Sequence, residues 1–150
     1  MARVELTGLS QPGPPTLFDA VGGRPFFDRL VTRFYEGVAT DPILRPLYPE
    51  DLTESVAHTA GFLAQYWGGG TAHYSDERGH PRLRARHGHV AIGQPERDAW
   101  VHHMLTALRA EHLPPDLEQP MIDYFEHGAT FMINQHPDRP DTIPVDPSPR

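Results

Sequence analysis

The segment Pro25-Phe-Phe-Asp-Arg-Leu-Val-Thr-Arg-Phe-Tyr-Glu-Gly-Val38 decides the fold class of this chain. Its apolar residues recur at spacings of three and four, which is the period of one buried helix face, and a proline near the start suits a first helical turn. The same period returns in residues 51–67, 94–108 and 116–132. No window shows the sustained period-two alternation of a half-buried strand, so we predict an all-α protein.

Shorter segments connect these predicted helices. Residues 16–21 read as a short helical stretch, and residues 42–49 contain too much proline for more than a tight helical corner. Asp51, with a glutamate three residues later, predicts a capping box at the start of the second long helix. Residues 71–93 are polar and rich in arginine and histidine, and within them only 81–87 is predicted to be a short helix. We expect an irregular, functional insertion there.

Proline in the two end segments marks the limits of the folded domain. Eight of the 17 prolines lie in residues 1–15 and 136–150, which contain few large apolar residues. Segments of that composition do not bury enough apolar surface to fold. We therefore predict disordered tails on either side of one domain that covers residues 16–135.

The charge and the cysteine count exclude several classes of function. The 150 residues include 13 Lys and Arg against 20 Asp and Glu, which gives a net charge of −7. An acidic chain has no electrostatic footprint for nucleic acid, and the absence of cysteine removes disulfides, thiolate metal sites and cysteine nucleophiles. No stretch approaches the ~18 apolar residues of a membrane span. We expect a cytoplasmic protein with no nucleic-acid partner and no membrane insertion.

Histidine is the residue type left to carry chemistry. The serines lie in no G-x-S-x-G turn, and Gly68-Gly-Gly70 lacks the continuation of a phosphate-binding loop. The neighbouring histidines in His87-Gly88-His89 and His102-His103 point in different directions on a helix or strand and form no chelate. His87 differs, because it closes the short predicted helix, and a haem needs only one axial imidazole and an apolar pocket. From the residues alone, a satisfied structural histidine is the commoner alternative.

Three aromatic residues with polar edges lie on the apolar sides of three different segments. They are Tyr35, Tyr48 and Trp100. Each brings an O–H or N–H group that must find a partner when it is buried. Two interpretations stay open at this point: core packing with the polar edge reaching water or backbone, and convergence on a polar ligand inside an apolar pocket.

Six motifs, in order along the chain, extend this pattern. They are Phe18-Asp-Ala-Val-Gly-Gly23, Arg33-Phe-Tyr-Glu-Gly-Val38, Leu47-Tyr-Pro-Glu50, Phe62-Leu-Ala-Gln-Tyr-Trp-Gly-Gly69, Tyr74-Ser-Asp-Glu-Arg-Gly-His-Pro-Arg-Leu-Arg-Ala-Arg-His87 and Glu96-Arg-Asp-Ala-Trp100. With these motifs the sequence resembles the group II truncated haemoglobins, over residues 16–135. The resemblance implies a helical two-over-two sandwich around haem b, the iron complex of protoporphyrin IX.

The resemblance also implies roles for individual residues. His87 matches the proximal ligand of the haem iron, and Tyr35, Tyr48 and Trp100 match the hydrogen-bonding cage on the distal side. Donors of this kind stabilise a bound ligand that carries partial negative charge in a low-dielectric pocket, and so slow its escape. The resemblance therefore implies a haem protein whose distal donors slow the escape of a bound ligand.

Two positions on the distal helix, Ser55 and Thr59, face the ligand in the family. The second is usually a larger apolar residue there, so Thr59 departs from the family pattern. We consider two hypotheses for its hydroxyl group: a further hydrogen bond to bound ligand, or a water molecule that enters the pocket and speeds autoxidation.

Contacts to the macrocycle are the last group of site residues that the resemblance implies. His58, Tyr74, Arg84 and Arg86 are candidate partners of the haem propionates, which favour cationic or donor groups. For the two arginines, simple solvent exposure is an equal alternative. The remaining candidates for cofactor contacts are Phe62, Leu63, Leu83 and Met104.

Two classes of function follow from this site. In the first, the protein reversibly binds dioxygen, carbon monoxide and nitric oxide, for oxygen storage, transport, delivery or sensing. In the second it is an enzyme that turns over peroxide or converts nitric oxide with oxygen to nitrate, with an external reductase to restore ferrous iron. Sulfide is a further candidate ligand, and a homodimer is compatible with the sequence. A helical protein that binds a non-haem metal through histidine is the remote alternative.

Overall fold

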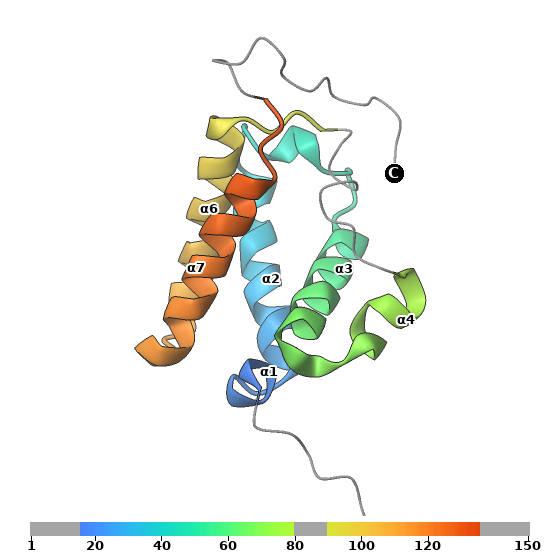
Figure 1. The fold of residues 1–150 in the computed structure, drawn as a ribbon. Coiled ribbons are helices and arrows are strands. Elements are labelled where there is room, and N and C mark those ends of the chain that lie inside the picture. The colour runs from blue at the N-terminus through green and yellow to red at the C-terminus, as the bar shows by residue number, and fades with distance from the viewer. Residues whose placement is uncertain (1–15, 80–89, 136–150) are drawn as a thin grey trace, which may run out of the picture.

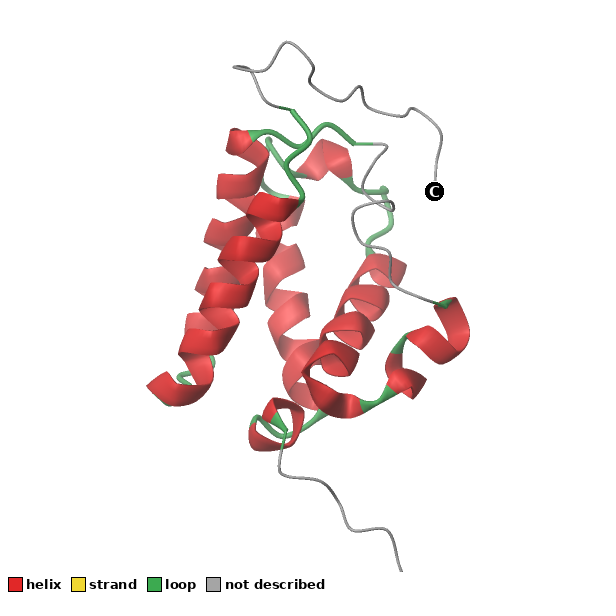
Figure 2. Ribbon diagram, in the orientation of Figure 1, coloured by secondary structure: helices red, strands yellow, loops and turns green. Residues whose placement is uncertain are grey.

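The computed structural model describes residues 16–79 and 90–135, and these are helical with no strand (Figure 2). Four long helices dominate: α2 (Arg24–Ala39), α3 (Thr53–Ala64), α6 (Gln94–Arg109) and α7 (Pro115–Phe131). α2 packs against both α3 and α6, and α6 runs beside α7, so that α2 joins the two sides of the molecule (Figure 1). The predicted all-α class is confirmed.

α2 supplies the centre of the hydrophobic core. Every residue of its predicted apolar face is buried: Phe26, Phe27, Leu30, Val31, Phe34, Tyr35 and Val38. Burial of a large apolar side chain stabilises a fold by roughly 1.5–3 kcal/mol. This one helix therefore anchors its neighbours on both sides.

The segments on either side of α2 are short helices, as predicted. α1 (Leu17–Ala20) begins with a capping box, in which Asp19 N–H donates to Thr16 Oγ1 at 3.2 Å and Thr16 N–H donates to Asp19 Oδ2 at 3.3 Å. The proline-rich corner contains the 3₁₀-helix η1 (Arg45–Leu47). It carries the chain from the end of α2 to the start of α3.

The start of α3 differs from the prediction. Thr53 is its first residue, and its N–H group donates to the Asp51 carboxylate at 2.9 Å. Because a side chain that reaches only two residues forward makes a turn, Asp51 precedes the helix and the predicted capping box is corrected to this turn.

α3 continues into a wider turn, η2 (Gln65–Gly69), before the chain reverses. Gly68 has a φ of 104°, and a Cβ atom there would lie 2.6 Å from Thr16 Cβ. A side chain at Gly61 would meet the His73 carbonyl oxygen at 2.2 Å. Both glycines are therefore required by close packing of one segment on another.

The segment after η2 is more regular than predicted. It forms the 3₁₀-helix η3 (Thr71–His73) and the helix α4 (Ser75–Arg78). Gln65 fixes the second turn, because its amide donates to Ser75 Oγ and accepts from Ser75 N–H, both at 2.8 Å. Single turns of three or four residues show no hydrophobic period, so the sequence pattern missed them.

Several sequence-based expectations fall outside the described residues. These are the two tails, the short helix over 81–87, and the site residues Leu83, Arg84, Arg86 and His87. The segment ahead of α6 is held by Asn134, which accepts from Ile92 N–H at 2.9 Å and donates to Val90 O at 2.8 Å. Within 16–79 and 90–135, no helix is long and apolar enough to cross a membrane.

Candidate functional site

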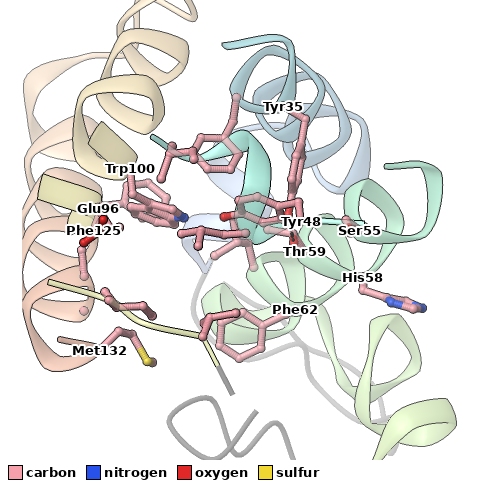
Figure 3. Close-up of a pocket in the computed structure, with 18 of the residues that line it drawn as sticks. Tyr35, Tyr48, Ser55, His58, Thr59, Phe62, Glu96, Trp100, Phe125 and Met132 are labelled. Atoms are coloured by element: carbon pink, nitrogen blue, oxygen red, sulfur yellow. Dashed lines mark hydrogen bonds between the residues drawn. The ribbon is translucent and has the colours of Figure 1, made fainter. Parts of the chain in front are cut away.

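A cavity of about 390 Å³ lies between the α2–α3 side and the α6–α7 side of the molecule. Its volume is in the range of small-molecule and cofactor sites. Figure 3 shows side chains from several helices converging on it. The lining consists of Phe34, Tyr35, Leu44, Leu47, Tyr48, Ser55, His58, Thr59, Phe62, Leu63, Tyr74, Arg78, Val90, Ile92, Glu96, Arg97, Trp100, Tyr124, Phe125, Gly128, Ala129 and Met132.

Tyr35 and Thr59 form one polar pair in this apolar lining. The Tyr35 phenol oxygen lies 3.1 Å from Thr59 Oγ1, and Tyr35 is buried. Burial raises the pKa of Tyr35 above its ordinary value, and hydrogen bonding to Thr59 and Ser55 opposes that rise. The two hydroxyl groups carry two protons. One proton lies in the hydrogen bond between the two oxygens, and the other can be donated to a ligand.

Tyr48 and Trp100 form a second polar pair. The indole nitrogen of Trp100 and the phenol oxygen of Tyr48 point toward one another (Figure 3), and hydrogen bonding from the indole opposes the strong rise in the pKa of Tyr48 that burial causes. An indole N–H only donates, so the phenol oxygen of Tyr48 is the acceptor. The O–H proton of Tyr48 is therefore left for another acceptor.

Neighbouring aromatic rings hold these polar groups in place. Tyr35 and Tyr48 meet edge to face at 5.4 Å between ring centroids. Trp100 lies against Phe34 at 5.3 Å and against Phe125 at 5.9 Å. Because aromatic pairs of this geometry stabilise one another beyond simple burial, the three donor side chains have defined positions before any ligand arrives.

A cationic group lies at another part of the lining. Arg78 Nη1 is 3.1 Å from His58 Nε2, and its guanidinium carbon lies 5.7 Å from the ring centroid of Tyr74, which is buried. The structure thus brings two predicted propionate partners, His58 and Tyr74, to the cavity wall. It adds Arg78, which the sequence reasoning did not single out.

The predicted contact residues divide into three groups. Phe62 and Leu63 line the cavity, together with Tyr35, Tyr48, Ser55, Thr59 and Trp100. Met104 is fully buried in the core and lies outside the lining. His87 and the three residues Leu83, Arg84 and Arg86 lie outside the described part of the chain.

The sequence reasoning also missed one wall of the cavity. Phe125, Ala129 and Met132 line it, and the sequence predicts only that they belong to the apolar period of residues 116–132. Tyr124 joins them, and burial raises the pKa of its phenol to about 12. The signal was present as the apolar stripe of α7, but periodicity does not separate a face that meets protein from one that meets a ligand.

The side chains present fit the haem that the sequence motifs imply. Phe62, Leu63, Phe125 and Met132 offer an apolar surface for a flat macrocycle, and a Cβ atom built at Gly128 would meet nothing within 4 Å. Arg78 and His58 offer donors for its carboxylates. Within the two described ranges, no three His, Asp or Glu side chains gather to hold a bare metal ion.

Known proteins of similar sequence and structure are hemoglobins. Residues 16–134 match the family model described as bacterial-like globin. The group 2 truncated hemoglobin YjbI of Bacillus subtilis is 38% identical over 118 residues, which cover 79% of this chain and 88% of that protein.

Solved structures extend the similarity to the fold. The thermostable hemoglobin of the actinobacterium Thermobifida fusca is 50% identical, with a TM-score of 0.77 over 79% of this chain and 97% of its own. The hemoglobin of the thermophilic phototrophic bacterium Chloroflexus aurantiacus is 46% identical, with a TM-score of 0.78 over 81% of this chain and 100% of its own. The truncated-globin fold predicted from the motifs is confirmed.

The buried phenols make the folded state sensitive to alkali. Burial raises the pKa of Tyr48, whereas tyrosine in an unfolded chain ionises near pH 10. Above that pH the unfolded state has released a proton that the folded state still holds, so the free energy of unfolding falls as the pH rises. We expect the free energy of unfolding of the wild type to fall, relative to that of Tyr48→Phe, by about 1 kcal/mol between pH 10 and pH 11.

Urea unfolding of both proteins at neutral and alkaline pH measures this difference. Between about pH 6 and 8 no tyrosine ionises, so the difference should be constant there, which serves as the internal control. A difference that stays constant up to pH 11 would contradict the burial of the Tyr48 phenol.

Proposed function

This chain belongs to the bacterial-like globin family as a truncated haemoglobin of group II, and we propose that it retains dioxygen through hydrogen bonds from Tyr48 and Tyr35. As a globin it binds haem b, whose iron supplies reversible binding of dioxygen and other small diatomic ligands. The residues of the chain decide how long a ligand stays. Slow release suits sensing or scavenging better than delivery.

The direction of the hydrogen bond at Tyr48 carries this proposal. The indole N–H of Trp100 faces the phenol oxygen of Tyr48 and can only donate, so the Tyr48 proton is left for an acceptor in the cavity. Burial holds the phenol in its protonated form at neutral pH. In an apolar lining such a donor is worth more than in water, because water does not compete for the same acceptor.

Tyr35 contributes differently, because its hydroxyl group already has Thr59 as a partner at 3.1 Å. A ligand that accepts from Tyr35 exchanges with that bond or uses the second proton of the pair. We propose that Thr59, with Ser55 beside it, tunes Tyr35 and does not itself hold the ligand.

We further propose that His87 is the iron ligand. His58, the histidine that the described residues place on the cavity wall, has its Nε2 atom occupied with Arg78 at 3.1 Å. His87 lies in the segment whose sequence matches the proximal motif. His58, Tyr74, Arg84 and Arg86 are proposed to meet the propionates, with Arg78 added by the structure, and Phe62, Leu63 and Leu83 to contact the macrocycle.

A separate reductase that restores ferrous iron is the partner we propose. Conversion of peroxide, or of nitric oxide with oxygen, is the competing use of the same pocket, and sulfide is a further candidate ligand.

A stopped-flow measurement of oxygen release, combined with peroxide and nitric oxide reactivity on one sample, separates these uses. Slow release with little turnover supports retention. Fast release, or rapid turnover of either substrate, would overturn it. The cytoplasmic location and the homodimer stay predictions.

Replacement of His87 by glycine should remove the covalent link between the chain and the iron. We expect the isolated variant to lose most of its Soret absorbance, and added imidazole to restore it, because a free imidazole can occupy the ligand position. His127→Gly, on the exposed side of α7, is the control and should keep its haem. Full haem content in His87→Gly would show that another residue binds the iron.

Replacement of Tyr48 by phenylalanine should speed oxygen release by about tenfold, because one hydrogen bond in a desolvated site is lost. Trp100→Phe should have a smaller effect, since it removes the partner that fixes the phenol and leaves the donor in place. Tyr66→Phe removes an exposed phenol, 52% accessible, and should release oxygen at the wild-type rate. An unchanged rate in Tyr48→Phe would refute the proposed retention.

The roles of Tyr35 and Thr59 are separated by two substitutions. Thr59→Val keeps the shape of the side chain and leaves the Tyr35 proton available, so release should be no faster than in the wild type. Tyr35→Phe should speed release by about threefold to tenfold, because it removes the donor. If Thr59→Val speeds release as much as Tyr35→Phe, Thr59 itself holds the ligand. Autoxidation measured on the same samples reports water entry.

A further inference from the structure

His103 and Asp41 form a short hydrogen bond outside the cavity. Nε2 of His103, on α6, lies 2.6 Å from Oδ2 of Asp41, which follows the end of α2. Both side chains are largely buried, with exposures of 20% and 14%. Neither residue lines the cavity. Because a carboxylate only accepts, Nε2 carries the proton and donates.

The other oxygen of the Asp41 carboxylate organises the corner that leads to Tyr48. Oδ1 accepts the N–H of Ile43 at 2.7 Å and the N–H of Leu44 at 3.3 Å. The Asp41 backbone carbonyl accepts the N–H of Arg45 at 2.8 Å. One carboxylate therefore connects α6 to the first turn of the corner. The hydrogen bond from His103, followed by those from the Ile43 and Leu44 amides, lowers the pKa of Asp41 below its ordinary value and keeps the carboxylate ionised.

A glycine lets the imidazole reach this position. A Cβ atom at Gly37 would lie 2.4 Å from Nδ1 of His103, which is inside any acceptable contact distance. The ring of His103 is thus seated directly on the backbone of α2. α2, the corner and α6 all meet at this one side chain.

The same three elements carry the donors of the cavity. Tyr35 precedes Gly37 by two residues on α2, and Tyr48 ends the corner. Trp100 precedes His103 by three residues on α6, which places the two on neighbouring positions of one helix face. The relative position of the donors therefore depends on how α2, the corner and α6 are joined.

We infer that His103 is a positioning residue for ligand retention: its hydrogen bond to Asp41 holds the Tyr48 corner against the helix that carries Trp100. This role rests on the proposed function of Tyr48. When the bond is removed, the corner moves relative to α6, and the Tyr48 phenol loses its fixed alignment with the indole. The donor remains in the chain but is held less well in the geometry that a ligand requires.

A double-mutant cycle in the haem-loaded protein tests this role. His103→Phe keeps a ring of similar size and removes the donor, and we expect oxygen release to speed up by about threefold to tenfold. In the Tyr48→Phe background the same substitution should change release by less than about twofold, because its effect passes through Tyr48. His102→Phe, the exposed neighbour on α6, is the matched control and should leave release unchanged.

Two further measurements give readouts that do not depend on ligand release. Hydrogen exchange at the Ile43 and Leu44 amides should be faster in His103→Phe and unchanged in His102→Phe, because the corner loses its connection to α6. His103→Gln carries an amide donor and should restore part of the wild-type behaviour in both assays. If His103→Phe fails to fold with haem, Asp41→Asn is measured by the same criteria, since the Oδ1 atom of asparagine still accepts from the Ile43 and Leu44 amides.

The outcomes separate this inference from the function it rests on. If Tyr48→Phe releases oxygen faster but His103→Phe behaves as wild type, the positioning role is overturned and the proposed function stands. If His103→Phe speeds release equally with and without Tyr48, it acts by another route and the inference is wrong. If Tyr48→Phe itself changes nothing, the proposed function is overturned and the positioning role with it.

Discussion

Burial of one face of α2 is the interaction on which the rest of this structure depends. That face meets α3 on one side and α6 on the other, so it sets the separation between the two sides of the molecule. Its last buried aromatics, Phe34 and Tyr35, also line the cavity. A helix that is both core and cavity wall leaves little freedom to the site, because any shift of the donors must also disturb close-packed apolar side chains.

The polar groups of the cavity cost stability when they are buried, whereas the apolar face of α2 adds stability. A buried hydroxyl or indole N–H without a partner costs about 1–3 kcal/mol. The chain meets this cost by pairing the groups with one another: Tyr35 with Thr59, and Trp100 with Tyr48. These pairs satisfy most of the hydrogen-bonding capacity and leave one proton in each pair, that of Tyr48 in the second, without an acceptor. That surplus is a cost to the empty fold and a gain once an acceptor is present, as expected for a functional site.

The sequence predicted the parts of the fold that repeat a signal over several turns. Seven apolar residues in α2 and the stripes of α6 and α7 identify long helices, because each face must be buried. The turns of η3 and α4 were missed because the contacts that hold them, such as Gln65 with Ser75, join residues ten apart and have no period. Arg78 stood in an arginine-rich segment, where nothing in the sequence distinguishes a residue that reaches the cavity.

Site prediction had a different limit. Spacing alone left His87 undecided between a ligand and a structural histidine, and only the family resemblance assigned it a role. Met104 shows a related limit of a helix face: it lies on the apolar stripe of α6 and packs in the core, and it is not part of the described lining of the cavity. Periodicity gives the direction in which a side chain points from its helix. It does not tell whether that side chain contacts other protein side chains or a bound ligand.

The departure at Thr59 changes which donor dominates. With an apolar residue in that place, the Tyr35 hydroxyl would lose its Thr59 partner and keep only Ser55 beside it. Here it already has a partner at 3.1 Å, so a ligand that takes the shared proton exchanges one hydrogen bond for another and gains less than it gains from an unshared proton. Tyr48, whose oxygen is satisfied by Trp100 and whose proton is not, gains a whole bond. Under the function we propose, retention in this chain depends on the Tyr48 corner more than on the core helix, and so on the contacts that hold that corner in place.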